Sequence, residues 1–590
     1  MPQRRGGGKR FSDAASDSSI FPAPRDGEGW AGDTEAEPAG GTGVTRRTRT
    51  LRYGSAERAG LLPAHLDRLV TEAERFLGPS PTHPWYAGAV LLAGRGDTVA
   101  LHRAIGWAVR YAAYDEATGT GVELPPERWV PMTEDTVFDL ASVSKLFTAI
   151  LAVQQIERGT LDLDARVTAY LPEFGGGGKR EVTVRQLLTH TSGFRAWIPL
   201  YEAPTREGKL RLLWEEVPAH TPGTAYLYSD LNLFALQLIL EEITARGLDT
   251  LLHDEITAPL GMHRTRFRPP LSWRPETAAT EDARPPWSGL DRGMVRGEVH
   301  DENAHGLGGV AGHAGVFSRA WDLAILARTL LDGGAHGTAR ILSPASVDLM
   351  FTDFNTAFPG DAHGLGFELD QRWYMGALAT PRSAGHTGFT GTSLVVDPTT
   401  DTFLIVLGNS VHPVRSWRSG SAPRVAAADA LARAVPVRSG RGRPSWFAGM
   451  ERDTTARLTL PETPGATRLT CALWWDTAPG DTVALEASAD GGESWRPVPF
   501  TTARPGAEPV PHPSGTVSGW SGRVWHEVDA PIPGPARLRW RYTTGGRYVG
   551  RGVYVDGARL LDATGRPVFA DDRPEDGGRV EAAGWTRSED

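Results

Sequence analysis

The residue pattern changes at Arg438–Ser445, and this change limits the possible folds more than any other feature of the chain. Before it, helix-like and strand-like segments follow one another; after it come short alternating strands separated by turns such as Ala489–Ser494. The stretch itself reads R-S-G-R-G-R-P-S, a composition typical of a linker. A chain of 590 residues also exceeds what one hydrophobic core organises, so two or three domains are expected.

The predicted boundaries follow from composition. Residues 1–48 are rich in Gly, Pro, Ser and charged residues and poor in apolar anchors, which predicts disorder. We then expect a first globular domain over residues 49–437, a linker at 438–445, a second domain over 446–572 and a flexible acidic tail at 573–590.

The first domain has strand patterns near both ends and helix patterns between them. The main expected elements are a helix within Ala59–Leu77, two strands within Ala87–Trp107, a helix from Ser142 to near Gly159, a hairpin over Gly391–Asn409 and a last helix at Ala426–Val435. This order indicates an α+β or mixed α/β domain whose sheet is closed by its two ends. The second domain has the short, regularly spaced strands of an all-β sandwich.

Composition excludes several function classes. The formal net charge is −9, and the 62 basic residues are scattered among 71 acidic ones, so no basic field calls for nucleic acid. Cys471 is the only cysteine, which excludes an intrachain disulfide and a thiolate metal cluster. No run approaches the ~18 apolar residues of a membrane span. The sequence as written shows no export signal, which predicts a cytoplasmic protein; a wrongly assigned start would permit an extracytoplasmic one.

The segment Asp139–Ala149 reads D-L-A-S-V-S-K-L-F-T-A and places a serine three residues before a lysine. On a helix, Ser142 and Lys145 would lie on one face, at an N-terminus that favours developing negative charge. A lysine in apolar surroundings can act as a proton acceptor and activate the serine. The alternative is an N-cap serine beside a lysine that reaches to solvent. Ser144 lies on a different face.

Two further motifs follow in order. Thr221–Asn232 reads T-P-G-T-A-Y-L-Y-S-D-L-N, and His386–Gly388 reads H-T-G before an apolar strand. With S-x-x-K, these motifs resemble the serine β-lactamase and penicillin-binding-protein superfamily, in its class C-like branch of esterases, D-aminopeptidases and DD-peptidases. Leu187–Gly193, Pro259–Met262 and Gly312–Ser318 resemble the same family, over about residues 55 to 435. The resemblance implies an antiparallel sheet flanked by helices with an all-helical subdomain, followed here by the sandwich.

The resemblance also implies roles. Ser142 would be the nucleophile, and Lys145 and Tyr228 would share its proton, with the lysine cation stabilising the tyrosine phenolate. The backbone N–H groups of Ser142 and Phe389 would form the oxyanion hole. The implied substrate-binding residues are Asp230, His386, Thr387, Gly388 and His313.

Two positions depart from the family pattern. Asp230 stands where Y-x-N has asparagine, and a carboxylate accepts hydrogen bonds where an amide can donate. His386 replaces the lysine of K-T-G, which binds a substrate carboxylate. Both changes favour an ester, a D-amino-acid amide or another acyl substrate over a β-lactam. Asn232 is left open as a compensating amide.

The Gly-rich loop Gly297–Gly315 holds three histidines, an aspartate and two glutamates, and invites a metal interpretation. Its spacing fits no metal motif, so we expect a loop that lines the cleft, with His313 or Asn303 touching substrate. His190 is interpreted as a structural histidine. No metal and no cofactor are expected.

The leading hypothesis is a serine hydrolase that forms an acyl-enzyme with a small-molecule or peptide substrate. The alternatives are a penicillin-binding DD-peptidase or β-lactamase, an acyltransferase of the same fold, and a non-catalytic binding protein. The sandwich resembles jelly-roll accessory domains of secreted hydrolases at Gly550–Leu560, so a glycan or cell-wall contact is a further expectation. Most of its aromatic side chains are expected in its core: Trp474, Trp475, Trp495, Trp520, Trp525, Trp540, Tyr542, Tyr548 and Tyr554.

Overall fold

The computed structural model describes residues 50–79, 82–417, 420–439, 441, 444–588 and 590. The disordered segment predicted for residues 1–48 lies outside this range, and so does part of the predicted linker. The described residues belong to one compact unit, with separate hydrophobic cores for an N-terminal α+β region and a C-terminal β-sandwich.

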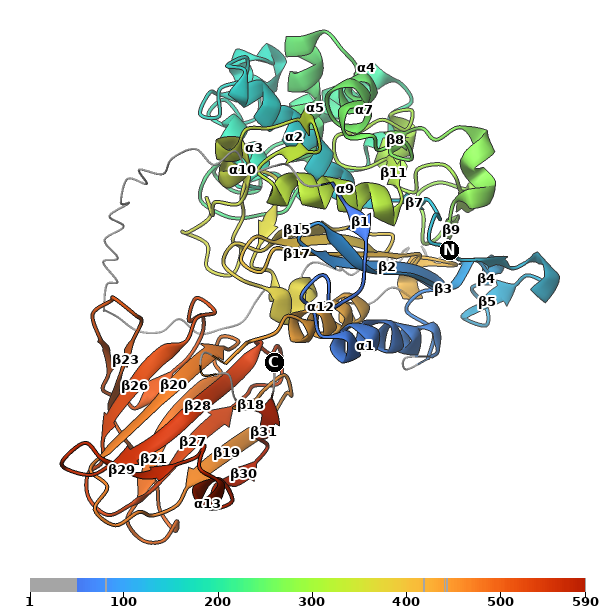
Figure 1. Cartoon of the computed structure of the whole chain (residues 1–590). Coiled ribbons are helices and arrows are strands. Elements are labelled where there is room, and N and C mark those ends of the chain that lie inside the picture. The colour runs from blue at the N-terminus through green and yellow to red at the C-terminus, as the bar shows by residue number, and fades with distance from the viewer. Residues whose placement is uncertain (1–49, 80–81, 418–419, 440, 442–443, 589) are drawn as a thin grey trace, which may run out of the picture. The chain divides into compact units, whose positions relative to one another are not determined.

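A single sheet organises the α+β region (Figure 1). Its strands lie in the order β1-β3-β2-β17-β16-β15-β14, with β6 paired to β3, and only the β1–β3 pair is parallel. The strands are β1 (Arg52–Tyr53), β2 (Gly88–Arg95), β3 (Thr98–Val109), β6 (Val130–Pro131), β14 (Glu368–Leu369), β15 (Ala384–Thr387), β16 (Thr392–Asp397) and β17 (Thr402–Gly408). Because β2 pairs with β17, the predicted closure of the sheet by the two ends of the region is confirmed.

Alternation along β2 divides the two faces of this sheet. Leu91 and its same-face neighbours pack with α1 (Pro63–Glu74) and α12 (Ala422–Ala434), which lie side by side on one face (Figure 1). Val90 and Leu92 point to the other face, which is covered by α2 (Ser144–Glu157), α5 (Asp230–Thr244) and α9 (Ala320–Leu331). Helices α1, α2 and α12 occur where the sequence pattern predicts helices.

Helix α2 is apolar on nearly every side, and a helix with that pattern has to be buried on every side. Twelve of its residues, from Ser144 to Gln155, are buried. The helix ends before Gly159, whose φ of 74° suits the left-handed conformation that commonly stops helices. Lys145 therefore enters the centre of the domain with the first turn of this helix.

A helical region packs above the sheet, as expected for the subdomain (Figure 1). It contains α3 (Val184–Leu188), α4 (Arg206–Glu215), α6 (Leu248–Leu252), a π-helical turn (His253–Thr257), α7 (Ala258–Leu260) and α8 (Glu302–Gly306). A small sheet in the order β7-β11-β8 joins β7 (Phe138–Asp139), β11 (Val316–Ser318) and β8 (Arg266–Phe267). This sheet fixes the segment that directly precedes Ser142.

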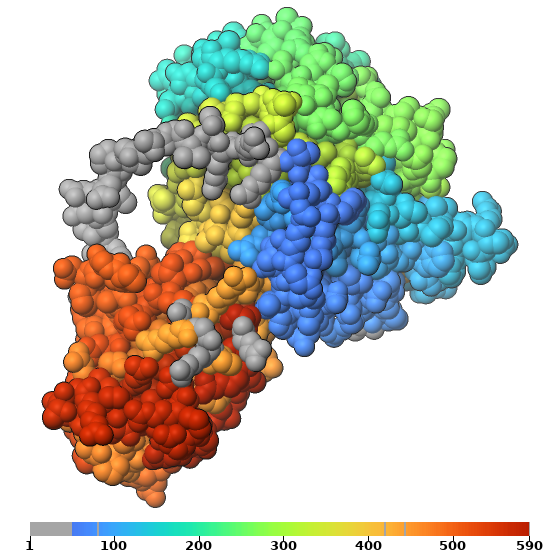
Figure 2. Space-filling view, in the orientation of Figure 1, coloured from blue at the N-terminus to red at the C-terminus, as the bar shows by residue number. Residues whose placement is uncertain are grey.

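The C-terminal region is an antiparallel β-sandwich, whose residues form a continuous surface coloured orange to red in Figure 2. One sheet has the order β24-β23-β26-β20-β28-β18-β31 and the other β22-β21-β27-β19-β30. The longer strands are β18 (Ser445–Ala448), β19 (Thr455–Leu460), β20 (Arg468–Asp476), β21 (Thr482–Ser488), β26 (His526–Pro531), β27 (Arg537–Thr543) and β28 (Gly552–Leu561). The shorter ones are β22 (Arg496–Pro497), β23 (Phe500–Ala503), β24 (Val510–His512), β30 (Glu581–Ala583) and β31 (Thr586–Ser588). Alternate residues such as Leu473 and Trp540 fill the space between the sheets.

The aromatic residues of the sandwich divide into two groups. Trp475, Trp540 and Tyr542 lie in the sandwich core, as predicted, whereas Trp474 and Tyr554 are buried in a separate small cluster with Val437. Trp495, Trp520, Trp525 and Tyr548 are half-buried.

The flexible acidic tail expected at residues 573–590 is wrong for the described part of that segment. Strand β30 (Glu581–Ala583) pairs with β19, and β31 (Thr586–Ser588) pairs with β18. Trp585 between them is buried in the sandwich core. One buried tryptophan and two strand pairings hold a segment that composition alone suggests is frayed.

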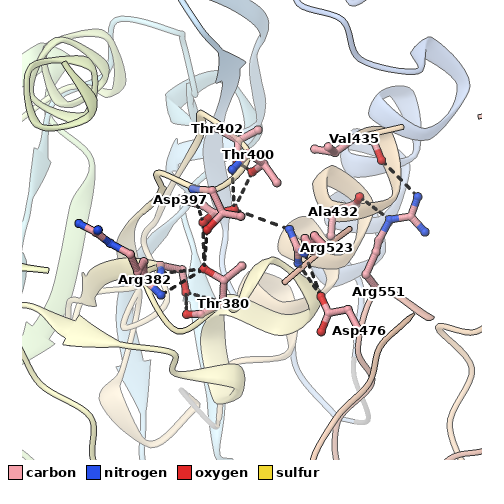
Figure 3. Close-up of polar contacts among 12 residues, drawn as sticks. Thr380, Arg382, Asp397, Thr400, Thr402, Ala432, Val435, Asp476, Arg523 and Arg551 are labelled. Carbon is pink, nitrogen blue, oxygen red and sulfur yellow. Dashed lines mark hydrogen bonds and ion pairs between the residues drawn. The ribbon is translucent and has the colours of Figure 1, made fainter. Parts of the chain in front are cut away.

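Buried arginines connect the sandwich with the α+β region (Figure 3). Arg551 donates to the carbonyls of Ala432 (2.9 Å) and Val435 (3.2 Å), at the C-terminal end of α12. Arg523 pairs with Asp476 of the sandwich at 2.9 Å and with Asp397 of β16 at 3.6 Å. Cations at the carbonyl end of a helix are stabilised by its dipole, so the contact is electrostatically favourable.

None of the helices in the described residues is both long enough and apolar enough to span a bilayer.

Candidate active site

The turn that carries Ser142 is backbone-strained and firmly anchored. Ser142 lies in a 3-10 turn, Ala141–Val143, that leads into α2, and Ala141 has a φ of 47° although it is not glycine. The carboxylate of Asp139 accepts the Ala141 N–H at 2.9 Å, and the Asp139 carbonyl accepts the Thr390 hydroxyl at 2.7 Å. Strained backbone of this kind persists only where surrounding contacts hold it, and it concentrates at functional sites.

Lys145 meets Ser142 as the i, i+3 spacing predicts. Its Nζ lies 2.7 Å from the Ser142 hydroxyl oxygen, and the side chain is only 1% exposed. The same Nζ lies 2.7 Å from a carboxylate oxygen of Asp230 and 3.3 Å from the carbonyl of His313. Ser144 is buried, and its hydroxyl accepts the Val316 N–H, so the structure places it away from Lys145.

Tyr228 completes the group around the serine. Its ring lies 4.9 Å from Lys145 Nζ. Burial, followed by the negative charge of Asp230, raises the pKa of Tyr228 well above its usual value. Both effects oppose the expected stabilisation of a Tyr228 phenolate by Lys145, and the part that Tyr228 plays in proton transfer stays a prediction.

The wall opposite is formed by β15 and the loop after it. The ring of His386 lies 5.8 Å from that of Tyr228. Its Nδ1 bonds to the Thr387 carbonyl, and burial lowers the pKa of His386 to about 3. The imidazole is therefore neutral at neutral pH, with Nδ1 as donor and Nε2 as acceptor, and Nε2 has no hydrogen-bond partner among the described residues.

Gly388 and Phe389 come close to the nucleophile turn. A Cβ on Gly388 would lie 2.3 Å from the Leu140 carbonyl oxygen, so only glycine fits there. The Thr392 hydroxyl donates to the same carbonyl at 2.9 Å. The segments that carry the two predicted oxyanion-hole N–H groups, those of Ser142 and Phe389, are thus held against each other. The Phe389 side chain stays 39% exposed.

His313 and Asp301 lie beneath Lys145. His313 Nε2 is 2.9 Å from Asp301 Oδ1. Burial alone would lower the pKa of His313, but the Asp301 carboxylate outweighs it and the pKa is raised. His313 is 2% exposed, so its ring does not face solvent. Its contact with Lys145 is made by the backbone carbonyl.

Asn303 and Asn232 are both engaged elsewhere. Asn303 accepts the Tyr201 N–H, donates to the Ile198 carbonyl and is 1% exposed, so it does not reach an open surface. Asn232 is fully buried and bonds to Ser192 and His190, so it does not replace the missing amide of Y-x-N. His190 accepts the Ser229 N–H at 3.1 Å, in agreement with the structural role predicted for it.

Asp230, Asp301 and His313 each bring one ligand-type atom within 4.8 Å of the others. Such a group can hold a metal, and the sequence analysis did not select this set. Here Lys145 already pairs with one carboxylate and His313 with the other. The negative charge that would attract a cation is compensated, so we interpret the set as an ion-pair network.

Two buried groups near the site escape sequence analysis. Arg424 on α12 donates to the carbonyls of Gly388 (2.9 Å) and Thr392 (3.1 Å). These two hydrogen bonds hold the ends of the loop between β15 and β16. Glu368 on β14 is buried near Tyr374, and burial raises its pKa to about 7. Neither belongs to a motif, and only the sheet order brings them close.

Comparison with known proteins agrees with this geometry. A family model described as Beta-lactamase matches residues 69–429, which is more than half of the chain. A curated protein of Salmonella agona, named "Putative D-alanyl-D-alanine carboxypeptidase", is 31% identical over 55% of this chain and 79% of its own length. A protein of the same name from Escherichia coli K12 is 32% identical over 48% of this chain and 72% of its own.

One solved structure, described as a class C beta-lactamase, has a TM-score of 0.50 at 18% identity. It covers 63% of this chain and 97% of its own. At this identity the likeness shows the fold alone.

Proposed function

Because the chain belongs to the Beta-lactamase family, we propose that this serine hydrolase cleaves ester or amide bonds through an acyl-enzyme on Ser142. The observation that carries the proposal is the buried Lys145 ammonium, 2.7 Å from the Ser142 hydroxyl oxygen. Burial of a lysine charge is costly, and Lys145, unlike the equally buried Lys179 that contacts two backbone carbonyls, places its ammonium against a hydroxyl and a carboxylate.

The remaining residues have separate roles in this proposal. The backbone N–H groups of Ser142 and Phe389 stabilise the oxyanion of the tetrahedral intermediate. Tyr228, whose phenol stays protonated, donates a proton to the leaving group. His386, Thr387 and Gly388 form the wall along which the acyl group lies, and Asp230 borders the opposite side.

The test is hydrolysis of p-nitrophenyl acetate and butyrate by the full chain beside its Ser142→Ala and Lys145→Ala variants. Loss of a member of such a catalytic group typically reduces kcat by a factor of ~10³ or more. Folding of each variant is checked by circular dichroism. Activity that persists in Ser142→Ala, or a wild-type chain inactive on all esters and D-amino-acid amides, contradicts the proposal and favours a binding role.

A second candidate is a D-alanyl-D-alanine carboxypeptidase, which is favoured by the printed names of the curated relatives. His386 argues against it, because a neutral imidazole does not offer the cation that would bind a substrate carboxylate. Covalent labelling by a fluorescent penicillin, together with D-alanine release from a D-Ala-D-Ala peptide, would select this candidate. Ester hydrolysis without either result would reject it, and product formation with an added alcohol would reveal a transferase.

For the sandwich we propose a glycan or cell-wall contact. Its support is the set of half-buried aromatic residues, of which Trp520 and Trp525 flank the loop before β26. Trp495 is less suited, because the Arg539 guanidinium covers its ring at 4.0 Å. Sedimentation of the full chain with insoluble peptidoglycan tests this, and equal sedimentation of a Trp520→Ala/Trp525→Ala double variant would contradict it.

A further inference from the structure

We propose that Asp230 is a positioning residue that stores the proton of Lys145, so that Ser142, Lys145 and Asp230 work as a proton relay. The inference rests on the proposed function, in which Ser142 is the nucleophile. It gives a chemical reason for Asp230 at the position where the Y-x-N motif has asparagine, since an asparagine side chain could not store that proton.

The geometry leaves the serine without another proton acceptor. Lys145 donates to the Ser142 oxygen, and an ammonium that donates cannot at the same time accept. Of its two other contacts, the His313 carbonyl at 3.3 Å takes no proton, whereas the Asp230 carboxylate at 2.7 Å does. Tyr228 is a protonated phenol and is equally unsuited to accept.

The buried position favours the exchange. As an ion pair, Lys145 and Asp230 carry opposite charges; after transfer they are an amine and a carboxylic acid, and the net charge of the pair is zero in both states. Burial raises the free energy of charged forms. Conversion of the ion pair to the neutral pair therefore costs less free energy in the first turn of α2 than it would in water. Lys145 is 1% exposed and the Asp230 side chain 19%.

Each proton can be followed through one catalytic cycle of the relay. Lys145 transfers one proton to Asp230 and becomes a neutral amine. Ser142 attacks the substrate carbonyl while its hydroxyl proton passes to this amine, which leaves an oxyanion, a lysine cation and a protonated Asp230. When the carbon–leaving-group bond breaks, the leaving group takes a proton from Lys145 or from Tyr228, which Lys145 then reprotonates. Asp230 returns its proton to the amine, the pair is restored, and water repeats the sequence in deacylation.

Asp230 is held where the relay needs it. It is the first residue of α5, a helix of 15 residues. Its N–H donates to the Ala196 carbonyl at 2.9 Å, and the preceding Ser229 caps the helix. An Asn in its place preserves these backbone contacts, so the substitution is expected to leave the fold intact.

Other titratable groups face the pair and have to be separated from it in any pH experiment. They are His190, Tyr228, Asp301, His313, Glu368 and His386. Glu368 is the main alternative source of a pH dependence. A group with a pKa of about 7 would also make kcat/KM fall on acidification near neutral pH. Glu368→Gln is therefore the matched control.

The experiment compares kcat/KM for p-nitrophenyl butyrate between about pH 5 and about pH 10 in the wild type, Asp230→Asn, Asp230→Glu and Glu368→Gln. A free ammonium releases its proton near pH ~10, far above a carboxylic acid at ~4. Without a carboxylate, activity requires the amine to lose its proton to solvent. We expect Asp230→Asn to lose about 100-fold at pH 7, to regain at least about tenfold by pH 9.5, and to shift its acid limb upward by two or more pH units.

Asp230→Glu should keep the fall of kcat/KM at low pH that the wild type shows, with a lower kcat/KM throughout. Glu368→Gln should keep both this fall and the wild-type kcat/KM. A profile of Asp230→Asn that superimposes on the wild type, or an equal loss at every pH, overturns the relay. Loss of the acid limb in Glu368→Gln also overturns it. Failure of the proposed function is seen separately: a fluorophosphonate probe located by peptide mass spectrometry would then not label Ser142, whereas failure of the relay alone leaves this labelling intact.

Discussion

Two buried cations, one in each region of the molecule, show how similar burial can have opposite consequences. Lys145 at the start of α2 and Arg551 in the sandwich are each 1% exposed. Lys145 faces a hydroxyl and a carboxylate. Arg551 faces two backbone carbonyls, with Tyr554 and Asp590 beside it.

The difference lies in what the partners can do with a proton. An ammonium can give up its proton, and both partners of Lys145 exchange protons. A guanidinium keeps its protons at any ordinary pH, and carbonyls accept hydrogen bonds without taking a proton. Burial therefore makes Lys145 reactive and makes Arg551 a structural contact. Three substitutions test whether this division holds.

Lys145→Arg is expected to have the largest effect. It keeps the positive charge beside Asp230 but removes the group that can pass on a proton, so kcat on p-nitrophenyl butyrate should fall by ~10³-fold or more. The counterpart Arg551→Lys should leave kcat within about twofold. Measurable turnover in Lys145→Arg would mean that charge, and not proton transfer, is what the lysine supplies; Lys145→Met guards against steric effects of the larger side chain.

Arg551→Met should act on stability instead. It removes the hydrogen bonds to Ala432 and Val435 and leaves Asp590 with less compensation, and breaking a buried ionic group typically costs about 3–5 kcal/mol. Urea unfolding of the full chain measures the change. The matched control is Arg457→Met, at an exposed position of β19, expected within about 0.5 kcal/mol of wild type. Equal changes in the free energy of unfolding for the two variants would contradict a structural role for Arg551.

Glu368→Gln should give the smallest change, visible as a pH dependence. The pKa of Glu368 is about 7 in the folded chain and has a reference value of 4.5, so the folded state binds more protons between these values. Its contribution to stability is fully present below about pH 4.5 and is lost as pH rises through about 7. Relative to wild type, the Gln variant should gain roughly 3 kcal/mol between pH 5 and pH 8 in urea unfolding. A constant difference across this range would show that Glu368 does not titrate there.

Local patterns predicted much of the fold and of the site. The i, i+3 spacing brings Ser142 to Lys145, and the apolar runs within Ala87–Trp107 and Gly391–Asn409 predict β2 and β17, which are buried on both faces. Tyr228 and His386 lie beside the serine and lysine as the motif order suggested. Their catalytic roles stay predictions until the variants are measured.

What sequence analysis missed depends on contacts between distant segments. The Y-x-N motif places Asp230 in the site, but nothing in the motif indicates that its carboxylate pairs with Lys145. Arg424 reaches the Gly388 carbonyl from a helix 36 residues later. The composition of residues 573–590 suggested a tail, and only the pairing with β18 and β19 shows why it is ordered.

The close approach of Gly388 to Leu140 limits how this enzyme can be adapted to other substrates. A side chain at position 388 would collide with the Leu140 carbonyl and push the two segments of the site apart. Laboratory evolution should therefore find few tolerated changes there. The neighbouring Phe389 keeps its backbone in the same segment while its side chain is partly exposed. Saturation mutagenesis at Phe389, with Gly388 left unchanged, is the natural starting point for altering substrate range.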